Sequence, residues 1–208
     1  MKSQPESDIS PVMPIPPVLP QLLSEIRGCR ICEEHLPCGP RPVLVAHKDA
    51  PILIIGQAPG QRVHDSGIAW DDPSGDRLRD WLGVERDTFY NERKIALVPM
   101  GFCYPGTGKS GDLPPRPECA DLWHDRLLAE LVNVKLTLLF GMYAQKYRLG
   151  NQRKPTLTAT VKAWKDYRPA CLPLPHPSPR NNRWLKNNPW FADEVLPYLK
   201  QRVKRLLK

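Results

Sequence analysis

The sequence contains no long apolar run. None of its 208 residues belongs to a stretch long and apolar enough to cross a membrane. The N-terminal segment, MKSQPESDISPVMPIPPVLP, lacks the extended apolar core of a secretory signal peptide. These two absences predict a cytoplasmic protein that does not bind a membrane. Residues 1–18 are expected to form a flexible, proline-rich arm.

Internal repeats and signs of a second domain are also absent. One domain over residues 19–208 is expected, with room for a single good core. Negative charge is in deficit, since 30 Lys and Arg residues face 22 Asp and Glu residues and leave a net charge of +8. That balance favours a polyanionic partner such as nucleic acid, with an ordinary basic soluble protein as the alternative.

Apolar runs alternate with amphipathic stretches along the chain. Buried strands are predicted at 50–56, 94–102, 135–141 and 168–175, and helices at 18–29, 76–84, 119–132, 142–150 and 188–208. This alternation predicts a single three-layer α/β/α domain around a central, mainly parallel four-stranded sheet. Ligands of such sheets bind at the carboxyl ends of the strands. Two of these ends carry unusual loops, GQAPGQRVHDSG at 56–67 and HPSPRNN at 176–182.

A third glycine-rich segment, GTGKSGD at 106–112, ends like a phosphate-binding P-loop but lacks the rest of that motif. The motif needs a glycine five residues before Gly108, where this chain has Cys103. It also needs a helix after the serine, and GDLPPRP cannot form one. We therefore expect no nucleotide cofactor.

The two strand-end loops carry groups suited to chemistry. Pro59 and Gly60 force a turn directly after a strand, and such a turn directs backbone N–H groups toward an oxygen-rich ligand. His176 lies between two prolines, and a rigidly held imidazole suits donation to a developing negative charge. Ser178 can bind a phosphate oxygen, and Arg180 can reach into a duplex or cap a phosphate.

Together, GQAPG and HPSPRN resemble the two signature loops of the uracil-DNA glycosylase superfamily. The first loop is similar to the iron–sulfur class of bacteria and archaea, which reads roughly G-E-A-P-G, then a further Gly seven residues on, then Pro-Phe. Here the corresponding residues are 56–60, Gly67 and Ala69-Trp70. The second loop is closer to the single-strand-selective monofunctional class, which also reads H-P-S-P-R-N. The resemblance spans about Cys29 to Arg183.

The resemblance implies a DNA repair enzyme that flips a damaged base out of DNA and hydrolyses the bond between base and sugar. This chemistry needs no oligomer, so a monomer is expected. His176 matches the histidine that donates to the departing uracil. Backbone N–H groups of the loop from Gly56 to Ala58 would add hydrogen bonds, and Trp70 stands where relatives stack a Phe on the base. The positions that pinch the phosphate backbone or fill the vacated space match Pro177, Ser178, Pro179 and Arg180.

One departure from the family pattern affects the attacking water. Many relatives position this water with an Asp or Glu in the first loop, where this chain has Gln57 and Ala58, neither of which can be a base. Either Gln57 holds the water or a nearby group activates it, with Asp65 as a catalytic candidate beside Asp71, Asp72 and His64. Asp71 and Asp72 have the alternative role of starting the following helix.

Three other functions stay open. The missing carboxylate leaves room for a DNA-binding module that kept the fold and lost the chemistry. Pro99 stands where relatives read the uracil edge with an Asn, which favours a glycosylase for another base such as hypoxanthine. A metal-dependent hydrolase that uses His64, Asp65 and the cysteines is disfavoured, because no two histidines lie at ligand spacing around a carboxylate.

The six cysteines of a cytoplasmic chain are expected to be reduced, as metal ligands or packed thiols. Cys29 and Cys32 form a C-x-x-C pair, and Cys103 and Cys119 form a wider second pair. The resemblance to the iron–sulfur class implies that these four hold a structural [4Fe–4S] cluster, with zinc or no metal as alternatives. The other two are expected to be ordinary thiols, although Cys38 is near enough to the first pair to replace a ligand: Cys38 and Cys171.

Overall fold

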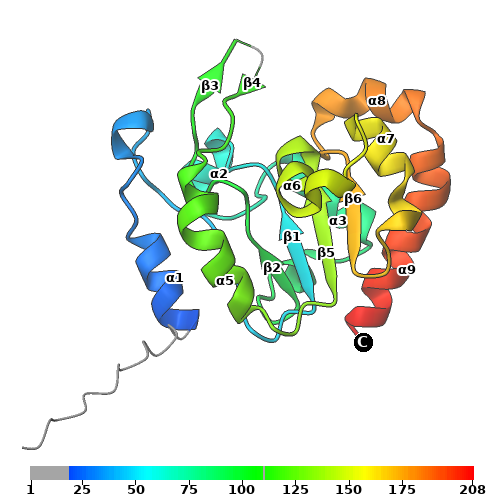
Figure 1. Cartoon of the computed structure of the whole chain (residues 1–208), viewed down its shortest axis with the longest axis horizontal. Coiled ribbons are helices and arrows are strands. Elements are labelled where there is room, and N and C mark those ends of the chain that lie inside the picture. Colours follow the sequence, from blue (N-terminus) through cyan, green and yellow to red (C-terminus); the bar gives the residue numbers. More distant parts are fainter. Residues whose placement is uncertain (1–18, 110) are drawn as a thin grey trace, which may run out of the picture.

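The computed structural model describes residues 19–109 and 111–208, and its centre is a parallel sheet (Figure 1). Four strands form this sheet in the order β2-β1-β5-β6, and each neighbouring pair is parallel. The predicted α/β fold with a central four-stranded sheet is confirmed. The predicted arm at residues 1–18 lies outside the described residues. The strands are β1 (Ile52–Ile55), β2 (Ile95–Leu97), β5 (Leu136–Phe140) and β6 (Cys171–Leu174).

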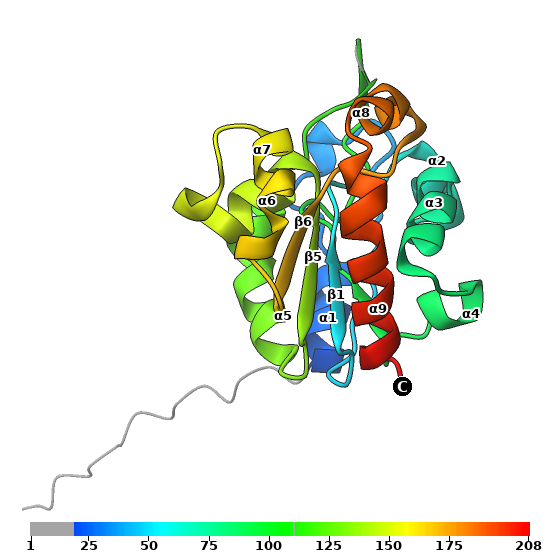
Figure 2. The same cartoon turned by 90° about the vertical axis from the view of Figure 1, so that its right-hand side faces the viewer.

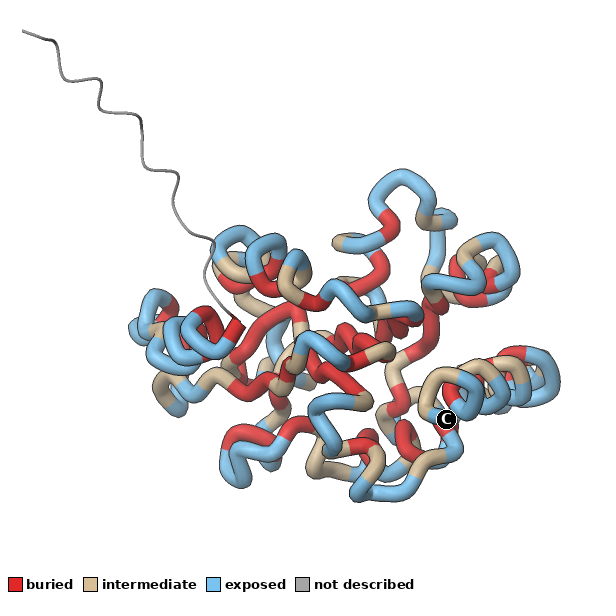
Figure 3. Tube along the Cα trace, turned by 90° about the horizontal axis from the view of Figure 1, so that it is seen from below, coloured by how far each residue is buried: buried red, intermediate tan, exposed pale blue. Residues whose placement is uncertain are grey.

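The strands are continuously apolar because both faces of the sheet are covered. Alternate residues of β1 reach opposite faces, so Ile52 and Ile54 pack in one apolar cluster and Leu53 and Ile55 in another. Every residue of β1, β2 and β5 is buried. Figure 3 shows these buried stretches running through the middle of the molecule. An apolar run of this kind is the pattern that a doubly covered parallel strand requires.

Helices cover the two faces of the sheet as separate layers (Figure 2). One layer holds α3 (Pro73–Leu82) and α9 (Leu196–Leu206), whose buried side chains pack with Ile52 and Ile54. The short helix α7 (Leu157–Lys162) packs against the edge strand β6, where its Val161 joins the same cluster. The other layer holds α1 (Leu19–Arg27), α5 (Asp125–Glu130) and α6 (Gly141–Leu149). The predicted three-layer arrangement is therefore confirmed. In the part of the chain that the structure describes, no helix is both long and apolar enough to pass through a membrane.

Two predicted helices are interrupted near their starts. The segment predicted as a helix at 119–132 opens with a π-helical turn, Ala120–His124, before α5. A second π-helical turn, Phe191–Val195, precedes α9 within the predicted helix at 188–208. A π-turn shifts the phase of the apolar stripe, so periodicity alone does not locate it. Pro197 lies in the first turn of α9, directly after the π-helical turn.

The structure contains several short elements that the sequence did not predict. Three of them follow the carboxyl ends of strands: α2 (Gln61–Ser66) after β1, the hairpin of β3 (Thr107–Gly108) and β4 (Gly111–Asp112) after β2, and α8 (Asn182–Asn187) after β6. A further short helix, α4 (Arg86–Phe89), lies between α3 and β2. Elements of this length are too short for a periodicity to show. The hairpin replaces the helix that a P-loop would require. We name it the β3–β4 hairpin, and it stands above the sheet in Figure 1.

Candidate active site

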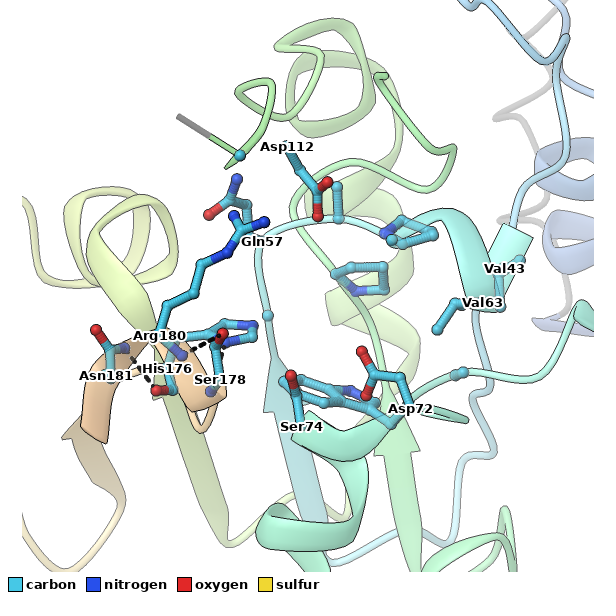
Figure 4. Close-up of a pocket in the computed structure, with 18 residues that line it drawn as sticks. Val43, Gln57, Val63, Asp72, Ser74, Asp112, His176, Ser178, Arg180 and Asn181 are labelled. Atoms are coloured by element: carbon cyan, nitrogen blue, oxygen red, sulfur yellow. Dashed lines mark hydrogen bonds between the residues drawn. The ribbon is translucent and has the colours of Figure 1, made fainter. Parts of the chain in front are cut away.

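A cavity of about 390 Å³ opens at the carboxyl ends of β1, β2 and β6 (Figure 4). Its volume lies in the range of small-ligand sites. The first loop, residues 56–60, forms one wall, and His176 and Ser178 of the second loop form another. Asp72 and Ser74 contribute from the start of α3, and Gly111 and Asp112 from the β3–β4 hairpin. The two unusual loops thus meet around one cavity, as the parallel sheet requires.

Most of the predicted site residues lie together here. The lining includes Gly56, Gln57, Ala58, Trp70, His176, Ser178 and Arg180. Pro177 and Pro179 flank Ser178 in the chain but are not among the lining residues, and Pro177 is buried while Pro179 is exposed.

Asp65 does not reach the cavity. The six-residue helix α2 turns its side chain to the exposed side, where it accepts a hydrogen bond from Gln61 Nε2 at 2.8 Å. The inward-facing residues of α2 are Val63 and His64. The prediction that treated 56–67 as a loop missed this helix, and the geometry gives no support to a catalytic Asp65.

The two neighbouring aspartates have structural partners. Asp72 is the N-cap of α3, and its Oδ1 accepts the Gly75 N–H at 2.8 Å. Asp71 pairs with Arg86 at 3.0 Å and lies outside the cavity lining. The alternative helix-start role is therefore confirmed for Asp72, which also borders the cavity.

His176 is held in one neutral form by its surroundings. Burial lowers its pKa from 6.5 to about 4, against a smaller opposing effect of the Asp112 charge. Its Nδ1 accepts the Ser178 N–H at 3.2 Å, so the proton of the neutral ring is assigned to Nε2. Asn181 Nδ2 donates to the His176 carbonyl oxygen at 2.7 Å and fixes the loop. The imidazole therefore offers a single N–H donor at neutral pH.

Trp70 forms part of the cavity wall beside His176 of the second loop. Its ring stacks on that of His176 with centroids 5.4 Å apart and meets Phe140 edge-on at 5.8 Å. It has a φ of 58°, the left-handed region, which costs free energy and is found at functional sites. A Cβ on Gly56 would lie 2.9 Å from the indole, and one on Gly75 would overlap the Trp70 carbonyl. Both glycines are needed where they stand.

The second loop is braced from outside. Arg77 of α3 donates to the Ser178 carbonyl oxygen at 3.2 Å. The Ser178 Oγ accepts the Arg180 N–H at 3.2 Å, which starts a short 3₁₀ turn. The Arg180 side chain extends toward Gln57 and lies against Gly111 of the β3–β4 hairpin (Figure 4). Arg180 thus lies at the cavity mouth, between the second loop and the hairpin.

Sequence reasoning missed the contribution of the β3–β4 hairpin. Gln57 Nε2 donates to the Leu113 carbonyl oxygen at 3.3 Å, and this ties the first loop to the end of the hairpin. Asp112 faces the first loop, with its Oδ2 3.6 Å from where a Cβ on Gly60 would stand. The sequence did contain one indication of this role: residues 106–112 follow a predicted strand, and the carboxyl ends of the strands are where ligands bind.

The four cysteines of the predicted cluster line one small cavity, which is separate from the cavity of the two loops. Cys29 and Cys32 follow α1, Cys103 follows β2, and Cys119 precedes the π-helical turn. Burial raises the pKa of Cys103 to about 11 and that of Cys119 to about 12, so both are thiols unless a metal ion displaces the proton. Between residues 19 and 109 and between 111 and 208, no three His, Cys, Asp or Glu side chains are grouped to hold a metal ion.

A family model agrees with this geometry. The model described as the uracil DNA glycosylase superfamily matches residues 43–200, which is well over half of the chain. The matched range contains the whole sheet and both loops of the cavity. This chain therefore belongs to the uracil DNA glycosylase superfamily.

Proposed function

We propose that the protein hydrolyses the bond between sugar and base at a uracil, or a related deaminated base, flipped out of DNA. The observation that carries the proposal is the neutral His176, whose Nδ1 is already engaged and whose Nε2–H is left as a donor in a cavity of nucleobase size. Membership of the superfamily and a net charge of +8 support DNA as the substrate.

The reaction places negative charge on the departing base. As the bond between C1′ and the base nitrogen breaks, its electron pair moves onto the base and chiefly onto the O2 of uracil. His176 Nε2–H is proposed to donate to that oxygen, and N–H groups of the first loop from Gly56 to Ala58 to add to the stabilisation. Trp70 stacks on the base, and residues 177–180 hold the phosphate backbone. A donor fixed before the reaction needs no reorganisation during it.

We also propose that Cys29, Cys32, Cys103 and Cys119 hold a [4Fe–4S] cluster. These thiols come from three segments and share one cavity. A [4Fe–4S] cluster takes one cysteine thiolate at each of its four irons, so these four cysteines would complete its ligand set. When bound, the cluster would cross-link the segment after α1 to the core, and no reaction step passes through it.

Pro99 favours a second candidate substrate. It lines the cavity with a side chain that has no hydrogen-bonding group, and its carbonyl oxygen is already 3.0 Å from His124 Nε2. Pro99 therefore offers no hydrogen bond to the polar edge of a uracil. A purine such as hypoxanthine is thus a second candidate base.

A cleavage assay on defined oligonucleotides tests the function. Anaerobically purified protein is mixed in excess with labelled single- and double-stranded DNA that carries one uracil or one hypoxanthine, and alkali then breaks the strand at any abasic site. We expect a break at one of these bases and none in unmodified DNA. Intact strands for every base and both strand forms would contradict the proposed function. That result would favour a DNA-binding protein without glycosylase activity.

Replacement of Trp70 tests the base pocket. Trp70→Ala should weaken capture of the flipped base by about 1–3 kcal/mol, because one aromatic stacking partner is lost. Trp70→Phe keeps an aromatic face and should retain most of the activity. Single-turnover rates against enzyme concentration measure capture. A sharp fall in melting temperature with unchanged activity per folded molecule would assign Trp70 to packing alone.

Arg180 should matter more on duplex than on single-stranded substrate. It lies at the cavity mouth, and only a duplex has a base stack to hold open. The measurement is the single-turnover rate of Arg180→Ala on both substrates, with the exposed Arg183→Ala as the matched loss of charge. An equal loss of rate on both substrates would indicate that Arg180 only contacts a phosphate.

A further inference from the structure

The β3–β4 hairpin brings a carboxylate to a site that lacks one in its first loop. Residues 56–60 supply Gln57 and Ala58 but no acidic group, and Asp112 is the residue that lines the cavity from the hairpin. Figure 4 shows its side chain pointing down from the hairpin toward the space between the two loops. The Oδ2 atom of Asp112 lies 3.6 Å from the place of a Cβ on Gly60.

Gln57 explains how this carboxylate is positioned. Its Nε2 donates to the carbonyl oxygen of Leu113, the residue directly after Asp112. The backbone of the hairpin closes the same end, since the Leu113 N–H donates to the Gly106 carbonyl oxygen at 2.8 Å. The amide that stands in the first loop therefore anchors the strand end that carries the carboxylate.

The other acidic side chains near the first loop are already engaged. Asp65 bonds to Gln61 on the exposed side of α2, Asp71 pairs with Arg86, and Asp72 caps α3. Asp112 pairs with Thr107 through the backbone of the hairpin, and among the described residues its carboxylate makes neither a hydrogen bond nor an ion pair. It is also the acidic group whose charge acts on His176.

We infer that Asp112 is the group that orients and deprotonates the attacking water, an inference that rests on the proposed function. The water oxygen forms the new bond to C1′ of the sugar as the bond from C1′ to the base breaks. Asp112 takes one proton of the water, the electron pair of the broken bond leaves with the base, and His176 Nε2–H stabilises that pair. The products are an abasic sugar and the base, and no oxidant or other co-reactant is needed.

The charges around the proposed reaction favour this arrangement. A negative carboxylate on the first-loop side of the cavity stabilises the positive charge that develops at C1′. His176 faces the same cavity from the end of β6, so the acceptor of the water proton and the donor to the base come from different walls. Arg180 lies against Gly111, next to Asp112 in the chain, and places a positive charge at the mouth of the same cavity.

Removing the carboxylate tests the inference. Asp112→Asn should lower the single-turnover rate on the order of 10²-fold or more, as expected for the loss of a general base. The affinity for substrate DNA and the melting temperature should stay near those of the parent protein. Asp87→Asn, an exposed aspartate on α4, is the matched control and should cleave at the parent rate.

A rescue experiment separates a chemical role from a structural one. Formate should restore part of the rate of Asp112→Ala, because a small carboxylate can occupy the vacated space. A structural role for Asp112 predicts no rescue by formate, and that result would overturn the inference.

The proposed function can fail separately. If Asp112→Asn cleaves at the parent rate while His176→Ala is slow, the water is activated elsewhere and the glycosylase proposal stands. Asp72→Asn keeps an oxygen able to cap α3, so a large rate loss in that variant alone would transfer the role to Asp72. If the parent protein cleaves no modified base, both proposals are wrong.

Discussion

His176→Ala should slow cleavage of the base–sugar bond on the order of 10²-fold or more in single-turnover assays, since it removes one donor to the developing oxyanion. Binding to DNA should change little, because phosphate contacts supply most of the affinity. With the His176 pKa at about 4, the donor is neutral at every pH at which the protein is assayed near neutrality, so its titration should not appear there. The measurement is the rate at saturating enzyme over a neutral pH series.

His47→Ala is the matched control for this prediction. His47 lies before β1 and contacts Asp49 rather than the cavity, so its loss should leave the rate unchanged. A His176→Ala protein that cleaves at the parent rate would remove His176 from the mechanism. It would leave the fold and the family membership untouched.

The second large effect concerns the cysteine cavity. Protein purified without oxygen should be brown and carry about four irons per chain. Cys119→Ser should lose most of this iron and unfold at a lower temperature, because the tie between the core and the segment after α1 is lost. Iron analysis, the visible absorption spectrum and the melting temperature report the effect.

Cys171→Ser provides the comparison, because Cys171 is half-buried at the start of β6 and lies outside this cavity. It should keep its colour and its iron. Colourless parent protein with neither iron nor zinc, in which all six thiols react, would rule out a metal centre. The glycosylase proposal would then rest on the two loops and the sheet.

The sequence predicted the features that depend on local pattern. The apolar run at 50–56 suits a strand covered on both faces, and β1 lies within it. A helix start was the alternative role of Asp71 and Asp72, and Asp72 caps α3. The two loops were placed at one edge of a parallel sheet, and they line one cavity there.

The sequence did not predict the features that depend on short elements and distant contacts. Asp65 was a candidate because neither Gln57 nor Ala58 can act as a base, but the six residues between Gly60 and Gly67 form a helix that turns Asp65 outward. Asp112 was overlooked because its place over the first loop comes from the hairpin and from the bond between Gln57 and Leu113. The residue pattern of 106–112 does not predict a contact between the first loop and the hairpin, because these segments are far apart in the chain.

The edges of the sheet explain how a chain with four apolar strands can avoid adding the strands of its neighbours. At the β2 edge, Val45 exchanges backbone hydrogen bonds with Leu97 at 2.9 and 2.7 Å and occupies the positions that another strand would use. At the β6 edge, Pro173 lies inside the strand and has no N–H to offer. Val45 and Pro173 thus hinder the addition of a strand from another molecule at either edge of the sheet, which would lead to fibres or domain swapping. Pro173 lies in β6, the strand whose end also positions His176.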